Sequence, residues 1–183
     1  MSDHYQWAAD LEADLQSAQA TVNRLRDWMI SQEIIVPEET DCVLGSERGH
    51  APGKNYARAV NWESPMLLKT VPNGVEFVAK HSVFYSCGVA ETTLTCPKCG
   101  QKSGHSDAWS DAVAGWYEKN GLGLLACQRC GIATPITDWP HEPPWAFGNV
   151  AVEFWNWPQL SDVFLKSVSE LTGHRFRLVD GKL

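Results

Sequence analysis

Residues 96–100 read Cys96-Pro97-Lys98-Cys99-Gly100, and residues 127–131 repeat the pattern as Cys127-Gln128-Arg129-Cys130-Gly131. Two residues between paired cysteines allow one tight turn to direct both thiolates at the same ion. Two such turns supply four thiolates, the ligand set of a closed tetrahedral Zn²⁺ site. The glycine after each pair permits the sharp turn that brings backbone N–H groups toward the sulfurs. The sequence therefore predicts a structural zinc site with Cys96, Cys99, Cys127 and Cys130 as its ligands.

Two other interpretations of these cysteines remain open at this point, a redox dithiol and a different metal such as iron. A redox Cys-x-x-Cys pair usually lies at a helix N-terminus in a thioredoxin-like unit. Both pairs here instead follow β-prone residues, and they occur as two matched copies, which favours zinc. His105 is near enough in sequence to replace one thiolate, but we expect it to be a loop residue.

Short β-prone runs lead into each cysteine pair, and another leaves the second pair (residues 92–95, 124–126 and 132–136). In this respect residues 92–136 resemble a zinc ribbon, a small β-element held by two Cys-x-x-Cys turns. The resemblance covers only this insert and implies metal binding without specifying a function, because zinc ribbons serve in transcription factors, ribosomal proteins, enzymes and adaptors alike.

The segment between the two cysteine pairs is longer than in compact zinc ribbons. Twenty-seven residues separate Cys99 from Cys127, compared with about 15–20 in compact versions. The pattern of residues 107–119 predicts a helix there, with an aromatic stripe that includes Trp109 and Trp116 and a natural stop at Asn120-Gly121. We expect this stripe to pack in the core rather than to bind a ligand.

The composition indicates a globular, acidic chain. It has 183 residues, 44% of them hydrophobic, nine tryptophans, and a net charge of −7. Because nucleic-acid affinity depends mostly on positive charge, this balance argues against a nucleic-acid partner. No apolar run approaches the roughly 18 residues that a membrane span needs. With no signal peptide in the first thirty residues, we expect a reduced, cytoplasmic protein.

We expect one domain over residues 1–183, with an N-terminal helix (1–32) and the zinc-ribbon insert (92–136). Apolar residues recur at steps of three and four over residues 4–31, which predicts an amphipathic helix. From Leu11 to Met29 the steps alternate strictly between four and three, as in a coiled-coil seam. The helix could therefore pack on its own chain, or it could form a homodimer.

The remaining segments predict an α+β fold with a small, mostly antiparallel sheet. Residues 66–71 and 75–80 flank Asn73-Gly74, a favoured hairpin turn, and a further short strand is expected at 83–86. Residues 138–148 form a proline-rich aromatic loop, followed by a strand at 150–157. A helix over 160–171, stopped by Gly173, and a strand over 174–180 complete a C-terminal strand–helix–strand unit, which could cross over onto the same sheet.

The sequence contains none of the catalytic motifs that we sought, so it favours a non-enzymatic role. His141-Glu142 is the best pair for acid–base chemistry, although adjacent residues on an extended loop usually point apart. Asp41-Cys42 is a weaker alternative, since a neighbouring carboxylate raises a thiol pKa. We expect Cys42 and Cys87 to be small buried hydrophobic residues.

We therefore expect a zinc protein that acts by binding another protein, as an adaptor, a regulator or a toxin-neutralising partner. Aromatic residues are common interface anchors, so Trp139, Trp145, Trp155 and Trp157 are the predicted partner-binding residues. The first alternative is a nucleic-acid-binding protein that uses Lys98, Lys102 and Arg129 of the ribbon. The second is an enzyme of unknown substrate with a site near His141 and Glu142.

Overall fold

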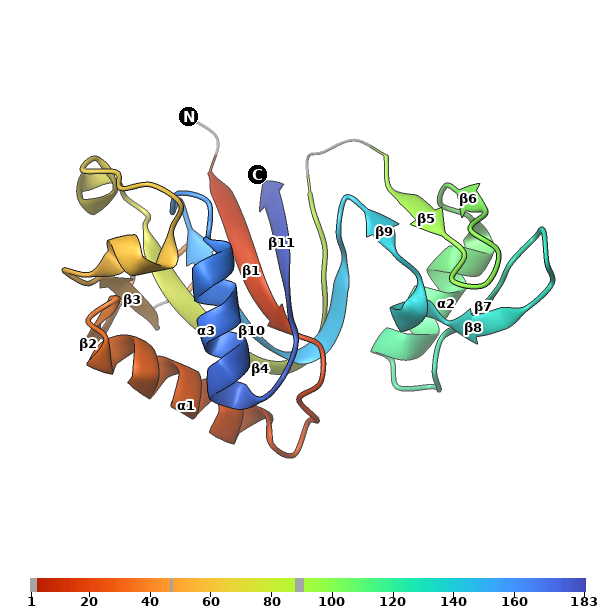
Figure 1. The fold of residues 1–183 in the computed structure, drawn as a ribbon, viewed down its shortest axis with the longest axis horizontal. Coiled ribbons are helices and arrows are strands. Elements are labelled where there is room, and N and C mark those ends of the chain that lie inside the picture. The colour runs from red at the N-terminus through yellow and green to blue at the C-terminus, as the bar shows by residue number, and fades with distance from the viewer. Residues whose placement is uncertain (1–2, 47, 88–90) are drawn as a thin grey trace.

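A computed structural model describes residues 3–46, 48–87 and 91–183 of the chain, and within these residues the fold is α+β (Figure 1). The helices are α1 (Ala18–Ser31), α2 (Asp107–Tyr117) and α3 (Asp162–Thr172), with short 3₁₀ helices η1 (Tyr56–Ala59), η2 (Leu67–Lys69) and η3 (Ile136–Asp138). The strands are β1 (His4–Asp10), β2 (Ile35–Thr40), β3 (Gly49–Pro52), β4 (Gly74–Phe84), β5 (Thr93–Thr95), β6 (Lys102–Ser103), β7 (Leu124–Ala126), β8 (Ala133–Pro135), β9 (His141–Glu142), β10 (Ala146–Trp155) and β11 (Phe176–Lys182).

Six strands form the main sheet, in the order β11-β1-β10-β4-β3-β2, and α1 and α3 lie together on one of its faces (Figure 1). β1 pairs antiparallel with both β10 and β11, so β10 and β11 run parallel to each other on either side of it. The chain passes from β10 to β11 through α3, as the predicted strand–helix–strand unit requires. α3 ends at Gly173, whose φ of 81° lies in the left-handed region that glycine adopts without strain.

The main core lies between the two helices and the sheet. Residues of α1 at three- and four-residue steps are buried there, as are alternate residues of β10, because a helix and a strand present one face at those two periods. The large side chains that are completely or almost completely buried include Leu25, Met29, Phe154, Trp157, Leu160 and Phe164. Burial of this much apolar surface is the dominant favourable term in folding.

The prediction of one helix from residue 4 to residue 31 is wrong in its first half. Residues 4–10 form β1, and α1 begins only at Ala18; residues 1 and 2 of the predicted 1–32 segment lie outside the described residues. β1 pairs with a strand at each edge, and both of its faces are largely buried, Ala8 in the main core and Tyr5 and Ala9 in apolar clusters on the other face. It therefore lacks the alternating pattern of a half-buried strand. The apolar side of α1 packs on its own chain, whereas Leu15 of the predicted seam is 47% exposed.

The predicted hairpin at residues 66–80 is also wrong. Only its second strand exists, as the start of β4, which pairs with β10 and ends at Phe84, so only the first half of the strand expected at 83–86 is present. Residues 67–69 form η2 instead, and the side-chain amide of Asn73 donates a hydrogen bond to the carbonyl of Leu67. The Asn-Gly turn signal is local, whereas the long-range pairing with β10 decides the course of β4.

A second core lies beyond the end of the main sheet, in a part of the chain that we call the cysteine module (residues 93–142). The module contains a three-stranded sheet in the order β6-β5-β9, the hairpin β7-β8, and α2 (Figure 1). The predicted ribbon strands and the predicted helix are therefore present, the helix as Asp107–Tyr117. Its core includes Leu94, Trp109, Leu125, Ile136 and Trp139, and Trp145 and Phe147 of the adjoining chain.

Candidate metal centre

The two cysteine pairs occupy matching turns at the ends of short strands. Cys96 follows β5 and Cys127 follows β7. The backbone N–H of Cys96 donates to the carbonyl of Gln101 at 2.8 Å, and that of Cys127 donates to the carbonyl of Ile132 at 3.1 Å. In each turn, the N–H of the first cysteine thus donates to the carbonyl five residues later. Both cysteine pairs therefore have the same orientation relative to the strand that precedes them.

The glycine that follows each pair closes the turn in a left-handed conformation. φ is 71° at Gly100 and 70° at Gly131, a region where residues with a side chain are strained. The N–H of Gly100 donates to the carbonyl of Cys96 at 3.0 Å, and the N–H of Gly131 donates to that of Cys127 at 2.8 Å. The sequence reasoning about these two glycines is therefore confirmed.

The four predicted ligand residues come together in one cluster. Their Sγ atoms all lie within 4.8 Å of one another, with 3.9 Å between Cys96 and Cys130 and 3.7 Å between Cys99 and Cys127. A disulfide would bring two sulfurs to about 2.05 Å. A metal with sulfur ligands at about 2.3 Å has tetrahedral edges of about 3.8 Å, which fits the observed separations. The four cysteines could therefore hold a metal ion.

The electrostatics of the cluster also suit a cation. The N–H of Cys130 and then that of Arg129 point at the Cys127 thiolate and lower its pKa to about 6. The N–H of Gln101 acts in the same direction on Cys99, but desolvation and the neighbouring thiols raise the Cys99 pKa to about 11. Without a cation the cluster thus resists full ionisation, and a divalent metal would favour the four-thiolate form.

Among the residues that the structure describes, these cysteines are the only group of three or more metal-ligating side chains close enough to share an ion. His105 does not join them. Its ring stacks on the indole of Trp109, with 3.9 Å between ring centroids and 8° between planes, so it belongs to the loop before α2, as predicted.

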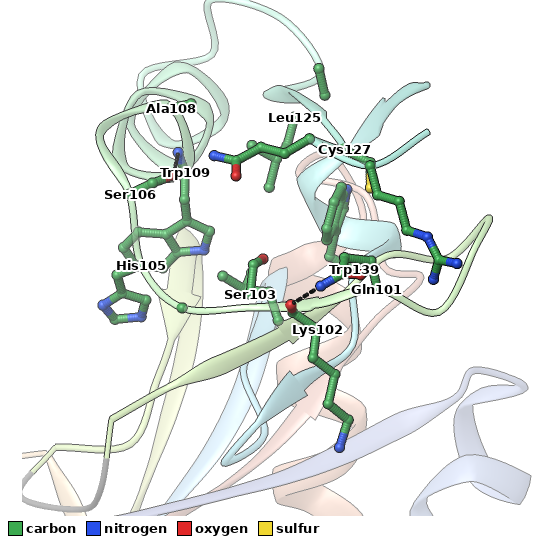
Figure 2. Close-up of a pocket in the computed structure, with 15 residues that line it drawn as sticks. Gln101, Lys102, Ser103, His105, Ser106, Ala108, Trp109, Leu125, Cys127 and Trp139 are labelled. Carbon is green, nitrogen blue, oxygen red and sulfur yellow. Dashed lines mark hydrogen bonds between the residues drawn. The ribbon is translucent and has the colours of Figure 1, made fainter. Parts of the chain in front are cut away.

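A pocket of about 460 Å³ adjoins the cluster and includes Cys127 in its wall (Figure 2). The indoles of Trp109 and Trp139 form part of its walls, and Ser103 and Ser106 add hydroxyl groups. In Figure 2 the Lys102 side chain extends away from the centre of the pocket, while Gln101 donates to the Lys102 carbonyl at 2.8 Å. No acidic side chain lines this pocket.

His141 and Glu142 do not form an acid–base pair. His141 is buried, its Nδ1 donates to the Trp139 carbonyl at 2.7 Å, and its Nε2 accepts from the indole of Trp109 at 3.4 Å. Burial lowers the His141 pKa to about 4, so the ring is neutral at physiological pH. Glu142 is exposed on the opposite side of β9. His141 therefore acts as a hydrogen-bonding core residue.

The four tryptophans that we predicted to contact a partner lie in the interior. The exposed fraction is 3% for Trp139, 8% for Trp145, 6% for Trp155 and 0% for Trp157. Together they contribute to three of the apolar clusters. Partner binding through these side chains stays an untested prediction, and in this conformation any partner would meet other residues first.

Cys42 and Cys87 are both half-buried beside the apolar cluster of Tyr5, Val43 and Trp155. Asp41 is exposed. The Cys42 sulfur packs closely over Gly74, where an added Cβ would meet it. Both cysteines therefore contact apolar side chains as expected, but they are half-buried rather than buried.

Sequence reasoning missed an exposed apolar segment around η2. The exposed fraction is 56% for Trp62, 66% for Met66, 58% for Leu68 and 87% for Val71. A signal was present at Trp62, which lies between Asn61 and Glu63 with no apolar periodicity that would bury it. We predicted a strand for residues 66–71, and a strand in a hairpin would have buried some of these side chains, so their exposure was not expected.

Among the helices of the described residues, none has the length and apolar character that crossing a bilayer requires. Comparison of the chain with protein-family models, with curated proteins and with solved structures found no match. The metal cluster and the surfaces described above are therefore the basis for any functional proposal.

Proposed function

We propose that this chain is a non-enzymatic, cytoplasmic protein that binds another protein, and that the cysteine module holds a structural Zn²⁺. A closed site of four thiolates has no open coordination position, so it supplies folding free energy rather than chemistry. Zinc suits a tetrahedral four-sulfur site that needs no redox change. A reduced compartment is expected because the four thiols must stay free to bind the ion.

The observation that carries the binding role is the exposed patch Trp62, Met66, Leu68 and Val71. It lies around η2, in the yellow segment at the end of the molecule opposite the cysteine module (Figure 1). Single exposed apolar residues are normal, whereas four of them within ten residues of the chain favour an interaction surface. Tryptophan and methionine are enriched at protein interfaces, and tryptophan is among the commonest energetic hot spots.

A pocket of about 730 Å³ lies beside this patch. Trp62 and Met66 form one part of its lining, and residues at the start of β1 and the end of β11 form another, including His4 and Asp180. The lining thus combines apolar and polar side chains, as protein–protein interfaces do. This surface replaces the buried tryptophans as the place where we expect the partner to bind.

A paired affinity purification tests the proposal. We expect the wild-type chain to retain a stoichiometric protein from native lysate, or to self-associate in sedimentation velocity. The double variant Trp62→Ser/Met66→Ser should reduce that binding at least about 30-fold, since an interface hot spot contributes about 2 kcal/mol or more. Both side chains are exposed, so the variant should fold normally.

Val163→Ser is the matched control, because Val163 is 72% exposed but lies outside the patch, on α3. It should bind like the wild type. Equal retention by all three proteins would contradict the assignment of the surface. The absence of both a protein partner and self-association would contradict the function itself.

A nucleic-acid partner is the alternative that one observation favours. The pocket beside the metal cluster includes Lys102 and Arg129 in its lining and no acidic side chain, although the whole chain carries a net charge of −7. Single-strand binders combine basic grooves with aromatic platforms. Nuclease treatment during the same purification separates the two functions: material that disappears with nuclease identifies nucleic acid, and material that persists identifies protein.

A further inference from the structure

Strand β4 continues past its neighbour β3 and therefore has an open edge. The register of the two strands joins only His50 and Val75, whereas β4 runs on to Phe84. The backbone N–H and C=O groups of successive strand residues point to alternate edges, so Phe77 and Ala79 direct theirs to the same side as Val75. In the described residues no strand pairs with them on that side. Their N–H and C=O groups are therefore available to a ligand.

A cavity of about 260 Å³ lies against this edge. Phe77 and Ala79 line it from β4, Arg26 lines it from α1, and Arg48 and His50 line it from the start of β3. The cavity shares no lining residue with the pocket beside the patch around η2. It therefore brings two guanidinium groups and an imidazole together beside an unpaired strand edge.

His50 is a buried side chain with one ring nitrogen left without a partner. Only 2% of the residue is exposed, and its Nδ1 donates to the carbonyl of Val36 at 3.0 Å. Its Nε2 makes no hydrogen bond in the described part of the chain, because Glu39 Oε1, also on the cavity wall, lies 4.0 Å away. A buried polar atom without a partner is costly. A ligand carboxylate beside Nε2 suits the imidazolium form, in which both ring nitrogens donate.

Both arginines of the cavity also keep donors for a ligand. Arg26 uses its Nε and Nη2 groups for Asp27, whose side chain is 68% exposed. Arg48 uses only Nε, which donates to Glu39 at 3.4 Å. The other guanidinium N–H groups make no hydrogen bond to the described residues. A guanidinium presents its donors in a planar fork that matches a carboxylate, so a ligand carboxylate competes only with water for them.

Two carboxylates also border the cavity, and each is engaged elsewhere. Glu39 is the acceptor of Arg48. Glu76 is directly opposed to Glu153 of β10, and burial, followed by the charge of Glu76, raises the Glu153 pKa to about 7. Strand side chains alternate between the two faces of a sheet, and Phe77 packs on the core beneath α1. The Glu76 carboxylate therefore lies beside Glu153 on the opposite face, and the cavity presents more donors than acceptors.

We propose that this edge of β4 binds the C-terminal end of an extended peptide from another protein. The peptide would lie in line with β3 and, like β3, antiparallel to β4. Its last residue would then adjoin the start of β3, where its carboxylate accepts from Arg26, Arg48 and His50. Its backbone would pair with Phe77 and Ala79, which is the β-strand addition that exposed sheet edges support. This site does not depend on the patch around η2.

A titration of the full-length protein with acetyl-Thr-Val-Thr-Val, a strand-forming peptide with a free carboxylate, tests the proposal. The backbone amide signals of Phe77 and Ala79 are followed by NMR at low salt, and we expect both to shift saturably. The same peptide as its C-terminal amide should bind at least about tenfold more weakly, because it loses hydrogen bonds between charged groups. Sodium acetate, which has no backbone to pair, should leave the Ala79 signal unchanged.

Arg26→Gln and Arg48→Gln should each weaken binding of the free acid at least about tenfold for the same reason. Arg24→Gln is the matched control, because Arg24 is exposed on α1 and does not line the cavity; it should bind like the wild type.

Three results would overturn the inference: no saturable shift with the free acid, equal binding of the acid and the amide, or wild-type binding by both cavity variants. Acetate that saturates the site as tightly as the peptide would show a site for small anions without strand addition, which also contradicts it. Trp62→Ser/Met66→Ser should bind the peptide like the wild type, so a failure at the patch around η2 is distinguished from a failure at this edge.

Discussion

Cys99→Ser should abolish metal binding and unfold the cysteine module. The wild-type chain should carry about one Zn²⁺ per molecule, and the variant close to none, because a structural site needs its complete ligand set. Metal binding supplies folding free energy directly, on the order of 10 kcal/mol or more for structural zinc. Metal analysis and amide hydrogen exchange measure the two effects.

The exchange data should separate the two cores of the molecule. We expect protection to be lost from β5 to η3, where Leu94, Leu125 and Ile136 pack around the cluster. Protection should persist in β1, β10 and α1, whose core lies between the helices and the main sheet. Cys42→Ser is the control, because Cys42 lies outside the cluster, and it should keep its metal. Near-equal metal content in Cys99→Ser and the wild type would refute the site.

Glu153→Gln should stabilise the protein at alkaline pH. The Glu153 pKa is about 7 in the folded chain, against 4.5 for an ordinary glutamate. The folded state thus holds this proton more tightly than the unfolded state, and stability falls as pH rises from about 4.5 through about 7. Above about pH 7 the loss of stability caused by ionised Glu153 is constant, at about 3 kcal/mol for a pKa shift of this size. Glu153→Gln removes this loss of stability, because glutamine has no carboxyl group to ionise.

Urea unfolding at pH 5 and pH 8 measures this effect. We expect the variant to be close to the wild type at pH 5 and more stable by about 3 kcal/mol at pH 8. Both proteins carry the same metal cluster, so their difference isolates residue 153. Glu142→Gln should match the wild type at both pH values, because Glu142 is exposed. A variant that is less stable than the wild type at pH 8 would contradict the burial argument.

The metal site could be predicted from the sequence because its information is local. Four cysteines at fixed spacing, each pair followed by glycine, specify two turns whose geometry depends little on the rest of the chain, and the structure places the four sulfurs together. The C-terminal helix and its stop at Gly173 could be predicted for the same reason. Cap and glycine signals act within a few residues.

The central strands could not be predicted in this way. β1 pairs with β10 and β11, which lie about 140–180 residues later, and no local pattern encodes that pairing. Because both faces of β1 are covered, its apolar residues fit a helix period as well as a strand. Likewise, no local pattern marks the surroundings of Glu153. Its direct opposition to Glu76 depends on the register of two strands that are distant in the sequence.

The most direct test of the account is X-ray absorption at the zinc edge on the purified wild-type protein. The arrangement of Cys96, Cys99, Cys127 and Cys130 predicts stoichiometric zinc with a single shell of four sulfur atoms at about 2.3 Å. Bound zinc with nitrogen or oxygen ligands, or a metal-free protein in which these cysteines form disulfides, would contradict it.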